Sequence, residues 1–226
     1  MKDADAFIRQ QGFYLPPFAY WTPQDWMEKG EEVREIVENG LGWDITDFGS
    51  GDYDRRGLFL FTLRNGRLEN WERLQGKLYA EKILVVGVDQ VTPFHFHWKK
   101  MEDIINRGGG ELAVQLYNAT RDEGLDRTND VRVSLDGVLH QVPAGGVVTL
   151  KPGESITLEP YCYHKFWGVK SRVLLGEVSM VNDDNVDNRF YEHIGRFPAI
   201  EEDAPPLYLL VNDYPRYYQP DGESLS

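Results

Sequence analysis

The sequence predicts an all-β dominated fold, an antiparallel sandwich or barrel with a helical extension before it and an irregular tail after it. Between residues 57 and 181, short runs rich in β-branched and aromatic residues alternate with turn signals about every 8–12 residues. No long helical pattern interrupts residues 110–181, which argues against a doubly wound sheet. At about 150 residues per domain, 226 residues amount to roughly one and a half domains, and we expect one domain over residues 1–226.

Residues 1–50 are expected to form an arm and one amphipathic helix. The segment Thr22–Asp25 combines a good N-cap, a proline at the first helical position and an acid in the first turn. Apolar side chains then recur at helical spacing until Asn39-Gly40, which is a typical helix stop. The pattern predicts one helix over about residues 23–38, preceded by an extended arm.

The β-barrel is expected over residues 57–181. The strand-like runs are Leu58–Leu63, Lys82–Val91, Leu112–Ala119, Val131–Leu135, Val138–Val142, Val147–Leu150, Ser155–Leu158 and Val173–Val181. The Asp136-Gly137 pair separates two of these runs and favours a tight hairpin.

The last segment, residues 182–226, is rich in Asp, Asn, Pro and Tyr, which predicts extended and irregular chain. It also carries apolar side chains such as Phe190, Phe197 and Leu209. We therefore expect this segment to wrap around the barrel or a partner subunit.

Charge and cysteine content narrow the possible partners. Lysine plus arginine is 24 and aspartate plus glutamate is 37, which gives a net charge of −13. That balance argues against a nucleic-acid binder and against docking on an anionic membrane. The single cysteine, Cys162, excludes an intrachain disulfide. The start of the chain has no apolar signal region and the apolar runs are short, so we expect a cytoplasmic protein.

Two histidines at strand spacing are the strongest chemical signal. His95 and His97 lie two residues apart, so on a strand both side chains point to one face and can bind one ion. A turn after Trp98 would return the Glu102 carboxylate to that ion, and His164 would reach it from a later strand. The spacing predicts a metal site formed by His95, His97, Glu102 and His164. The alternative is two surface histidines and one core histidine.

The residues around these ligands resemble a known family. The two histidine motifs are similar to those of the cupin superfamily, whose fold is a small antiparallel β-barrel or jelly roll that holds one ion. The segments that resemble the D-lyxose isomerase family are 94–110 (FHFHWKKMEDIINRGGG), 161–164 (YCYH), 176–179 (GEVS), 182–190 (NDDNVDNRF) and 194–198 (IGRFP). The resemblance implies a manganese-dependent aldose–ketose isomerase acting on D-lyxose, more weakly on D-mannose, and working as a homodimer.

Three imidazoles and one carboxylate suit Mn²⁺, Fe²⁺, Co²⁺ or Zn²⁺, and ligand chemistry alone does not select among them. Manganese is implied by the resemblance. Four protein ligands on an octahedral ion leave two positions, which a sugar carbonyl and its neighbouring hydroxyl could take.

An aldose–ketose isomerisation also needs groups that move protons. Lys100 lies between two expected ligands, and a nearby cation should lower its pKa, which suits an acid–base or oxyanion role. Lys99 is the competing lysine and a candidate for substrate contact. Glu192 is the expected carboxylate base, since the resemblance implies an acid at that position. The alternative for each of the three is a solvated surface residue.

Further side chains are expected to contact the sugar. Asp184 and Arg189 could hold its hydroxyls, and Trp167 could offer a ring face. Glu177 stands on an apolar strand, so we expect it to be half-buried and to support the site.

The sequence thus predicts a metal-dependent isomerase that interconverts D-lyxose and D-xylulose, and also D-mannose and D-fructose, through an enediol. Its partner would be a small neutral monosaccharide. Two alternatives stay open: a cupin Fe²⁺ dioxygenase with the same four ligands, and a sugar-binding cupin without catalysis.

Overall fold

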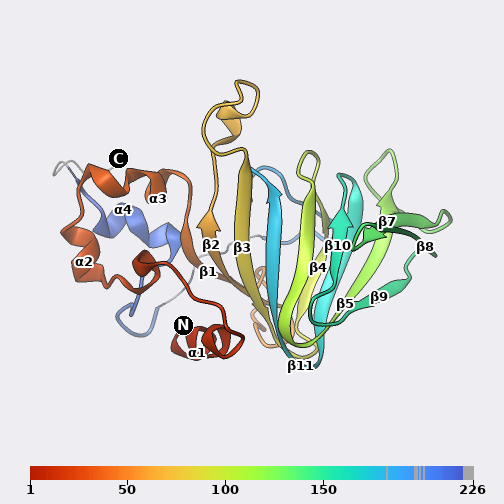
Figure 1. The fold of residues 1–226 in the computed structure, drawn as a ribbon, viewed down its shortest axis with the longest axis horizontal. Helices are drawn as coiled ribbons and strands as arrows, with labels where there is room; N and C mark the ends of the chain where they lie inside the picture. Colours follow the sequence, from red (N-terminus) through yellow and green to blue (C-terminus); the bar gives the residue numbers. More distant parts are fainter. Residues whose placement is uncertain (182, 196–197, 199, 201, 221–226) are drawn as a thin grey trace.

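The computed structural model describes residues 1–181, 183–195, 198, 200 and 202–220, and β-strands dominate it. The strands are β1 Gly42–Thr46, β2 Leu58–Arg64, β3 Tyr79–Val86, β4 Val91–Phe96, β5 Glu102–Ala119, β6 Leu125–Asp126, β7 Val131–Leu135, β8 Val138–Val142, β9 Val147–Leu150, β10 Ser155–Leu158, β11 Cys162–Met180 and β12 Arg189–Phe190. The helices are α1 Lys2–Gln10, α2 Pro23–Met27, α3 Arg34–Glu38 and α4 Tyr214–Tyr217, with short 3₁₀ turns η1 Pro17–Tyr20, η2 Glu31–Val33, η3 Leu68–Asn70 and η4 Val211–Asp213. Figure 1 shows helices α1–α4 to the left of the sheet, on the side of β1 and β2.

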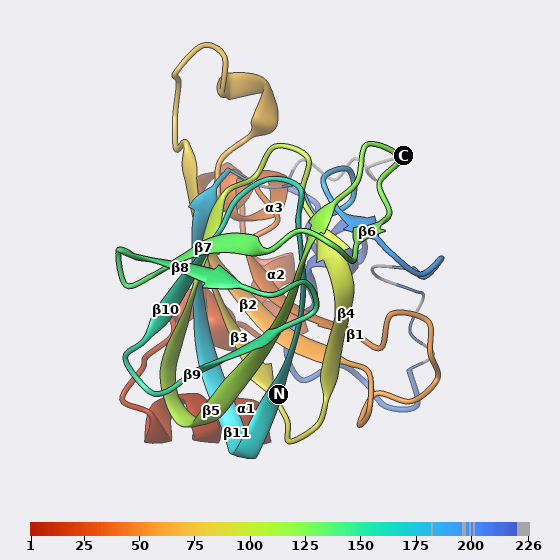
Figure 2. The ribbon, with the colours of Figure 1, turned by 90° about the vertical axis from the view of Figure 1, so that its right-hand side faces the viewer.

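Every pairing between these strands is antiparallel, which confirms the predicted fold class. The main path runs β1-β2-β3-β11-β5-β10-β7-β8, and β4 joins it through β11. Within the described residues no pairing links β1 to β8, so the sheet bends round without closing. Figure 2 views the molecule from the β7 and β8 side, with the helices behind the strands.

Two long strands connect the halves of the sheet. β5 and β11 pair along nearly their whole lengths, and the register shifts between Val169 and Val173. A Cβ at Gly109 would lie 2.2 Å from the carbonyl oxygen of Arg172, and one at Gly110 would lie 2.3 Å from that of Ser171. Only glycine permits this approach of the two backbones, so the glycine run sets the bend.

The bend brings two faces together over an apolar core. Leu60, Leu84 and Leu175 pack in this inner core, whereas their strand neighbours Phe61 and Ile83 belong to a second cluster on the other face. Strands β2, β3 and β11 are therefore buried on both faces, which accounts for their continuous apolar runs.

The N-terminal segment covers the face of the sheet that carries the second cluster. Its helices differ from the predicted ones. The expected extended arm contains helix α1, whose Ala4 and Ile8 pack in the second cluster. The expected helix over residues 23–38 is broken, because Gly30 adopts an extended conformation between α2 and η2. Its predicted start is confirmed: Thr22 and Asp25 form a capping box.

Strand boundaries also depart from the prediction. The expected run Lys82–Val91 is two strands, because Asp89 at φ 55° turns the chain between β3 and β4. Strand β5 begins at Glu102 and β11 at Cys162, about ten residues earlier than the apolar runs indicated. The sheet also takes in β1 from the predicted arm and β12 from the predicted tail.

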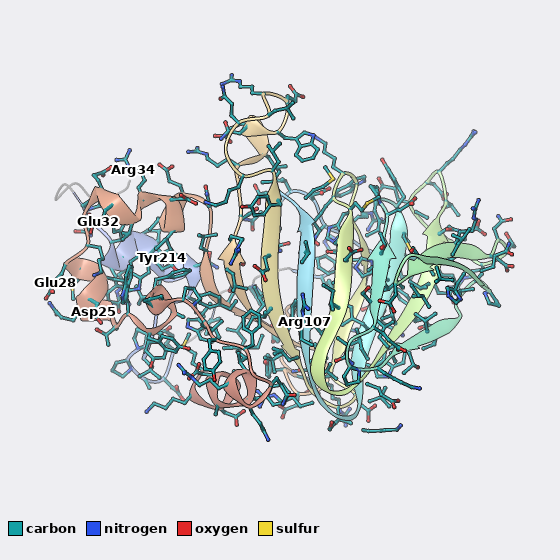
Figure 3. All side chains as sticks on the ribbon, in the orientation of Figure 1. Asp25, Glu28, Glu32, Arg34, Arg107 and Tyr214 are labelled. Carbon is teal, nitrogen blue, oxygen red and sulfur yellow. The ribbon has the colours of Figure 1, made fainter. Side chains whose placement is uncertain are left out.

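Residues 209–218 of the tail pack against the N-terminal helices. Trp26 is 1% exposed, and its ring lies 4.4 Å from that of Tyr214 and 6.4 Å from that of Tyr218. Figure 3 labels Tyr214 in α4, among the helices at that end of the molecule. The predicted packing of Phe197 lies outside the described residues. None of the described helices is long and apolar enough to cross a bilayer.

The Trp26→Ala substitution should destabilise the protein by about 3–5 kcal/mol, because it leaves a cavity between the arm and the tail. Thermal and urea unfolding measure this loss. The matched control is Trp71→Ala, at a side chain that is 36% exposed and should cost far less. Equal losses of stability in the two variants would contradict the conclusion that Trp26 holds the arm and the tail together.

Candidate metal centre

Four side chains from β4, β5, β11 and the residue that follows β4 meet in the interior of the protein. His95 lies on β4, His97 follows it directly, Glu102 opens β5 and His164 lies on β11, paired with His95. Their candidate ligand atoms all lie within 4.8 Å of one another. Each residue is at most 8% exposed. The sequence-predicted ligand set therefore forms one buried cluster.

Each imidazole is oriented by a hydrogen bond from Nδ1 to a backbone carbonyl. His95 and His164 each donate to the carbonyl two residues earlier, at 2.8 and 3.0 Å. His97 instead donates to the carbonyl of Asp187. With the proton on Nδ1, all three Nε2 atoms keep a free lone pair, which is the form that binds a cation.

Two of the Nε2 atoms are buried without a hydrogen-bond partner among the described residues. Those of His97 and His164 lie 3.4 and 3.2 Å from Oε1 of Glu102 and have no hydrogen-bond partner among the described residues. Buried polar atoms are rarely left in this way. A divalent cation among these atoms would give each of them a partner, so the residues fit a metal ion.

The pKa shifts of His95, His97 and Glu102 favour the forms of these side chains that bind metal ions. Burial, followed by the neighbouring His164, lowers the pKa of His95 well below its usual value, and burial together with Lys100 lowers the pKa of His97. Burial alone would raise the pKa of Glu102, but Lys100 and His97 lower it well below its usual value. Neutral imidazoles and an ionised carboxylate are the forms that ligate metals.

A chain of alternating charges extends from the cluster. Nζ of Lys100 lies 2.6 Å from Oε2 of Glu102 and 3.0 Å from Oε1 of Glu177. Nζ of Lys82 lies 3.3 Å from the same oxygen of Glu177 and 3.0 Å from Oδ2 of Asp184. Each cation thus bridges two carboxylates, which compensates the desolvation of these groups.

Lys100 is 2% exposed, so the surface alternative for this residue is wrong. Burial would lower its pKa, but the carboxylates of Glu102, Glu177 and Asp184 outweigh burial and raise it. In the protein without a metal ion, the pKa of Lys100 is therefore raised, whereas a lowered pKa beside a cation was expected from the sequence. An ammonium group at this position can stabilise negative oxygen and can share its proton with that oxygen.

The cluster faces a cavity lined by both polar and apolar side chains. Its lining comprises Phe48, Leu58, Leu84, Thr92, His95, His97, Lys100, Glu102, Ile104, Phe166, Glu177, Asp184, Asn188 and Phe190. Asp184 also lines a neighbouring cavity of about 330 Å³, together with Lys82. Of the predicted sugar contacts, Asp184 is the one that the structure brings to the cluster.

The remaining predicted site residues lie elsewhere. Lys99 is exposed. Arg189 bonds Glu123 at 2.9 Å, and Trp167 packs beneath the amine of Lys165. None of the three lines the cavity.

Glu192 also lies away from the cluster. Its side chain is 55% exposed and pairs with Arg56 at 2.8 Å. It lines a separate cavity of about 620 Å³, which includes Phe94 and Tyr117.

The roles of two charged residues in this network were not predicted from the sequence. Glu177 was expected only to support the site, and Lys82 was not singled out. Strand alternation carried the signal, because Glu177 follows Val173 and Leu175 on one face, and Lys82 precedes Leu84 and Val86 on one face. A charged residue in phase with core positions is rare unless it is paired.

The chain is similar to known sugar isomerases over most of its length. The family model described as D-lyxose isomerase matches residues 1–214. A D-lyxose/D-mannose isomerase of Serratia proteamaculans is 48% identical over 220 residues, covering 96% of this chain and 95% of that protein. The D-lyxose/D-mannose isomerase of Escherichia coli O157:H7 is 45% identical over 214 residues, covering 93% of each.

Solved structures show the same fold at low identity. The L-ribose isomerase of Cellulomonas parahominis superposes with a TM-score of 0.55 at 14% identity, covering 85% of this chain and 89% of that one. The Acinetobacter sp. DL28 L-ribose isomerase in complex with L-ribose gives 0.54 at 13% identity, with the same coverage. The match of the family model to nearly the whole chain confirms the resemblance found in the five sequence segments: the chain belongs to the D-lyxose isomerase family.

Proposed function

We propose that this chain is a metal-dependent aldose–ketose isomerase that interconverts D-lyxose with D-xylulose and D-mannose with D-fructose. The observation that carries the proposal is the buried cluster of three imidazoles and a carboxylate beside an ammonium group shared by two carboxylates. The names of the relatives from Serratia and Escherichia support both aldoses as substrates.

His95, His97, Glu102 and His164 would hold the metal, which we propose to be Mn²⁺. A divalent ion bound there polarises a carbonyl and stabilises negative oxygen. Fe²⁺, Co²⁺ and Zn²⁺ suit the same ligands, so the family resemblance alone favours manganese.

The proton transfers are assigned to the charge network. In the proposed reaction the Glu177 carboxylate removes the proton from C2 of the aldose and returns it to C1, so that the enediol forms and collapses to the ketose. The Lys100 ammonium donates a proton to O1 and recovers one from O2, which balances the reaction. Lys82 keeps Glu177 in place, and Asp184 would accept a hydrogen bond from a sugar hydroxyl.

Glu192 remains the alternative base. Its exposed position and its pairing with Arg56 favour Glu177, which lines the cavity beside the cluster. Sugar contacts by Lys99, Arg189 and Trp167 remain proposals. None of the three residues lines the cavity.

The proposed setting is a cytoplasmic homodimer that acts on free, neutral monosaccharides. The net charge of −13 supports a neutral substrate over a phosphorylated one, because negative charge repels phosphate. The dimer rests on the family resemblance.

With D-lyxose and Mn²⁺ in the absence of oxygen, the protein should form D-xylulose, and chelation should reduce the rate at least a hundredfold. Chromatographic analysis of the sugars together with an oxygen electrode makes the measurement. Oxygen consumption without anaerobic turnover would indicate the dioxygenase alternative. Tight sugar binding without turnover would indicate a binding protein.

The Glu177→Gln substitution should lower kcat for D-lyxose by about 10²–10⁴-fold, because the amide cannot take up the C2 proton. Steady-state kinetics and the exchange of the C2 proton with solvent measure the loss. Glu192→Gln tests the alternative base directly, and a comparable loss there with a near-normal Glu177→Gln variant would transfer the role to Glu192. The matched control is Glu111→Gln, at a surface partner of Lys170.

The metal-free protein should lose stability as the pH falls below about 6.5. His95 and His97 have lowered pKa values in the folded chain, so below that pH the unfolded chain binds more protons. Each histidine contributes a slope of up to about 1.4 kcal/mol per pH unit until its folded pKa is reached. Urea unfolding between pH 7.5 and 5.5 measures the slope. It should shrink in His95→Gln and persist in His140→Gln, whose side chain is exposed; a flat wild-type profile would refute the assignment.

A further inference from the structure

We propose that Asp187 is a positioning residue that fixes the loop between β4 and β5, and with it both a metal ligand and the ammonium group. The inference rests on the proposed function. Asp187 is 5% exposed and comes from the segment between β11 and β12, about 90 residues after the loop that it contacts.

The carboxylate accepts three successive backbone hydrogen bonds. Oδ1 accepts from the N–H of Trp98 at 2.9 Å and of Lys99 at 3.2 Å. Oδ2 accepts from the N–H of Lys100 at 3.0 Å. Three consecutive donors converging on one carboxylate define the path of the loop and hence the point from which the Lys100 side chain departs.

The backbone of the same residue contacts the cluster. The carbonyl oxygen of Asp187 accepts the hydrogen bond from Nδ1 of His97, which directs Nε2 of that histidine toward Glu102. One residue therefore orients His97 through its main chain and Lys100 through its side chain. A shift of Asp187 would move both groups together.

Asp187 contacts two residues that line the cavity in which the sugar would react. Lys100 and His97 line the cavity, whereas Asp187 itself does not. Asp187 would thus act through its neighbours and not on the sugar.

An amide at this position cannot replace the carboxylate. If its oxygen takes the place of Oδ1, its NH₂ group faces the N–H of Lys100, and two donors oppose each other. The Asp187→Asn variant keeps the backbone carbonyl and the side-chain volume, so it tests the three-bond contact and not the packing.

Isothermal titration of metal-free Asp187→Asn with Mn²⁺ should show affinity weakened about 10–100-fold. At saturating Mn²⁺, kcat for D-lyxose should fall at least tenfold, with a smaller change in KM. The matched control is Asp183→Asn, an equal charge change in the same segment. Its Oδ1 accepts a bond from the N–H of Asn185 at 3.0 Å, which an amide oxygen can also accept, so Mn²⁺ affinity and kcat should stay within about twofold.

A lower melting temperature with Mn²⁺ affinity and kcat unchanged would show a merely structural role and overturn the proposal. Wild-type protein that binds Mn²⁺ but does not isomerise D-lyxose would refute the proposed function, while the titration would still decide the role of Asp187. If Asp187→Asn does not fold, amide hydrogen exchange in the wild-type protein decides instead. Shared slow exchange at residues 98–100 supports the contact, and fast exchange at these amides excludes it.

Discussion

The burial of an ammonium group between two carboxylates is the interaction on which the rest of the structure depends. Moving a charge from water into a protein interior costs several kcal/mol even after relaxation. Lys100 lies within 3.0 Å of both Glu102 and Glu177, and Lys82 supplies a second cation to Glu177. These groups compensate one another only while three strands hold them in register. The apolar layers on both sides of β3 and β11 provide that rigidity.

The same arrangement places the candidate metal site directly beside the groups proposed to transfer protons. The three imidazoles form the candidate ligand cluster with Glu102, and Lys100 contacts both Glu102 and Glu177. The positive charge of Lys100 offsets the repulsion between these two carboxylates, which line one cavity. A single cation therefore serves the ligand set and the proposed base at once.

Local sequence patterns predicted the antiparallel fold class and the shared face of His95 and His97, because both depend on short-range periodicity. His164 was predicted from the spacing of the ligand motifs. His95 and His97 share a face through strand alternation, and the capping box of Thr22 and Asp25 is encoded within four residues. The family resemblance, carried by contiguous motifs, was confirmed in the same way.

Contacts across the chain could not be predicted in this way. The Asp187 carboxylate reaches residues 98–100 only after β11 has folded against β4 and β5, and no local pattern encodes that approach. The first half of β5 resembled a loop because Asn106 and its glycines obscure the alternation, although Asn106 is fully buried and bonds the backbone of Gly110 and Leu150. Helix α1 was missed because a short helix depends on the sheet beneath it.

The pairing of His164 with His95 has a consequence for the order of assembly. His95, His97 and Glu102 lie within eight residues, but the fourth member of the cluster arrives from a strand about sixty residues later. Closing such a loop carries an entropic cost that no local turn can avoid, so the complete site exists only once the long-range β-structure has formed. Small metal-nucleated domains acquire their fold from the ion. In this architecture the complete ligand set requires the folded sheet, so the proposed ion would bind after folding and would not direct it.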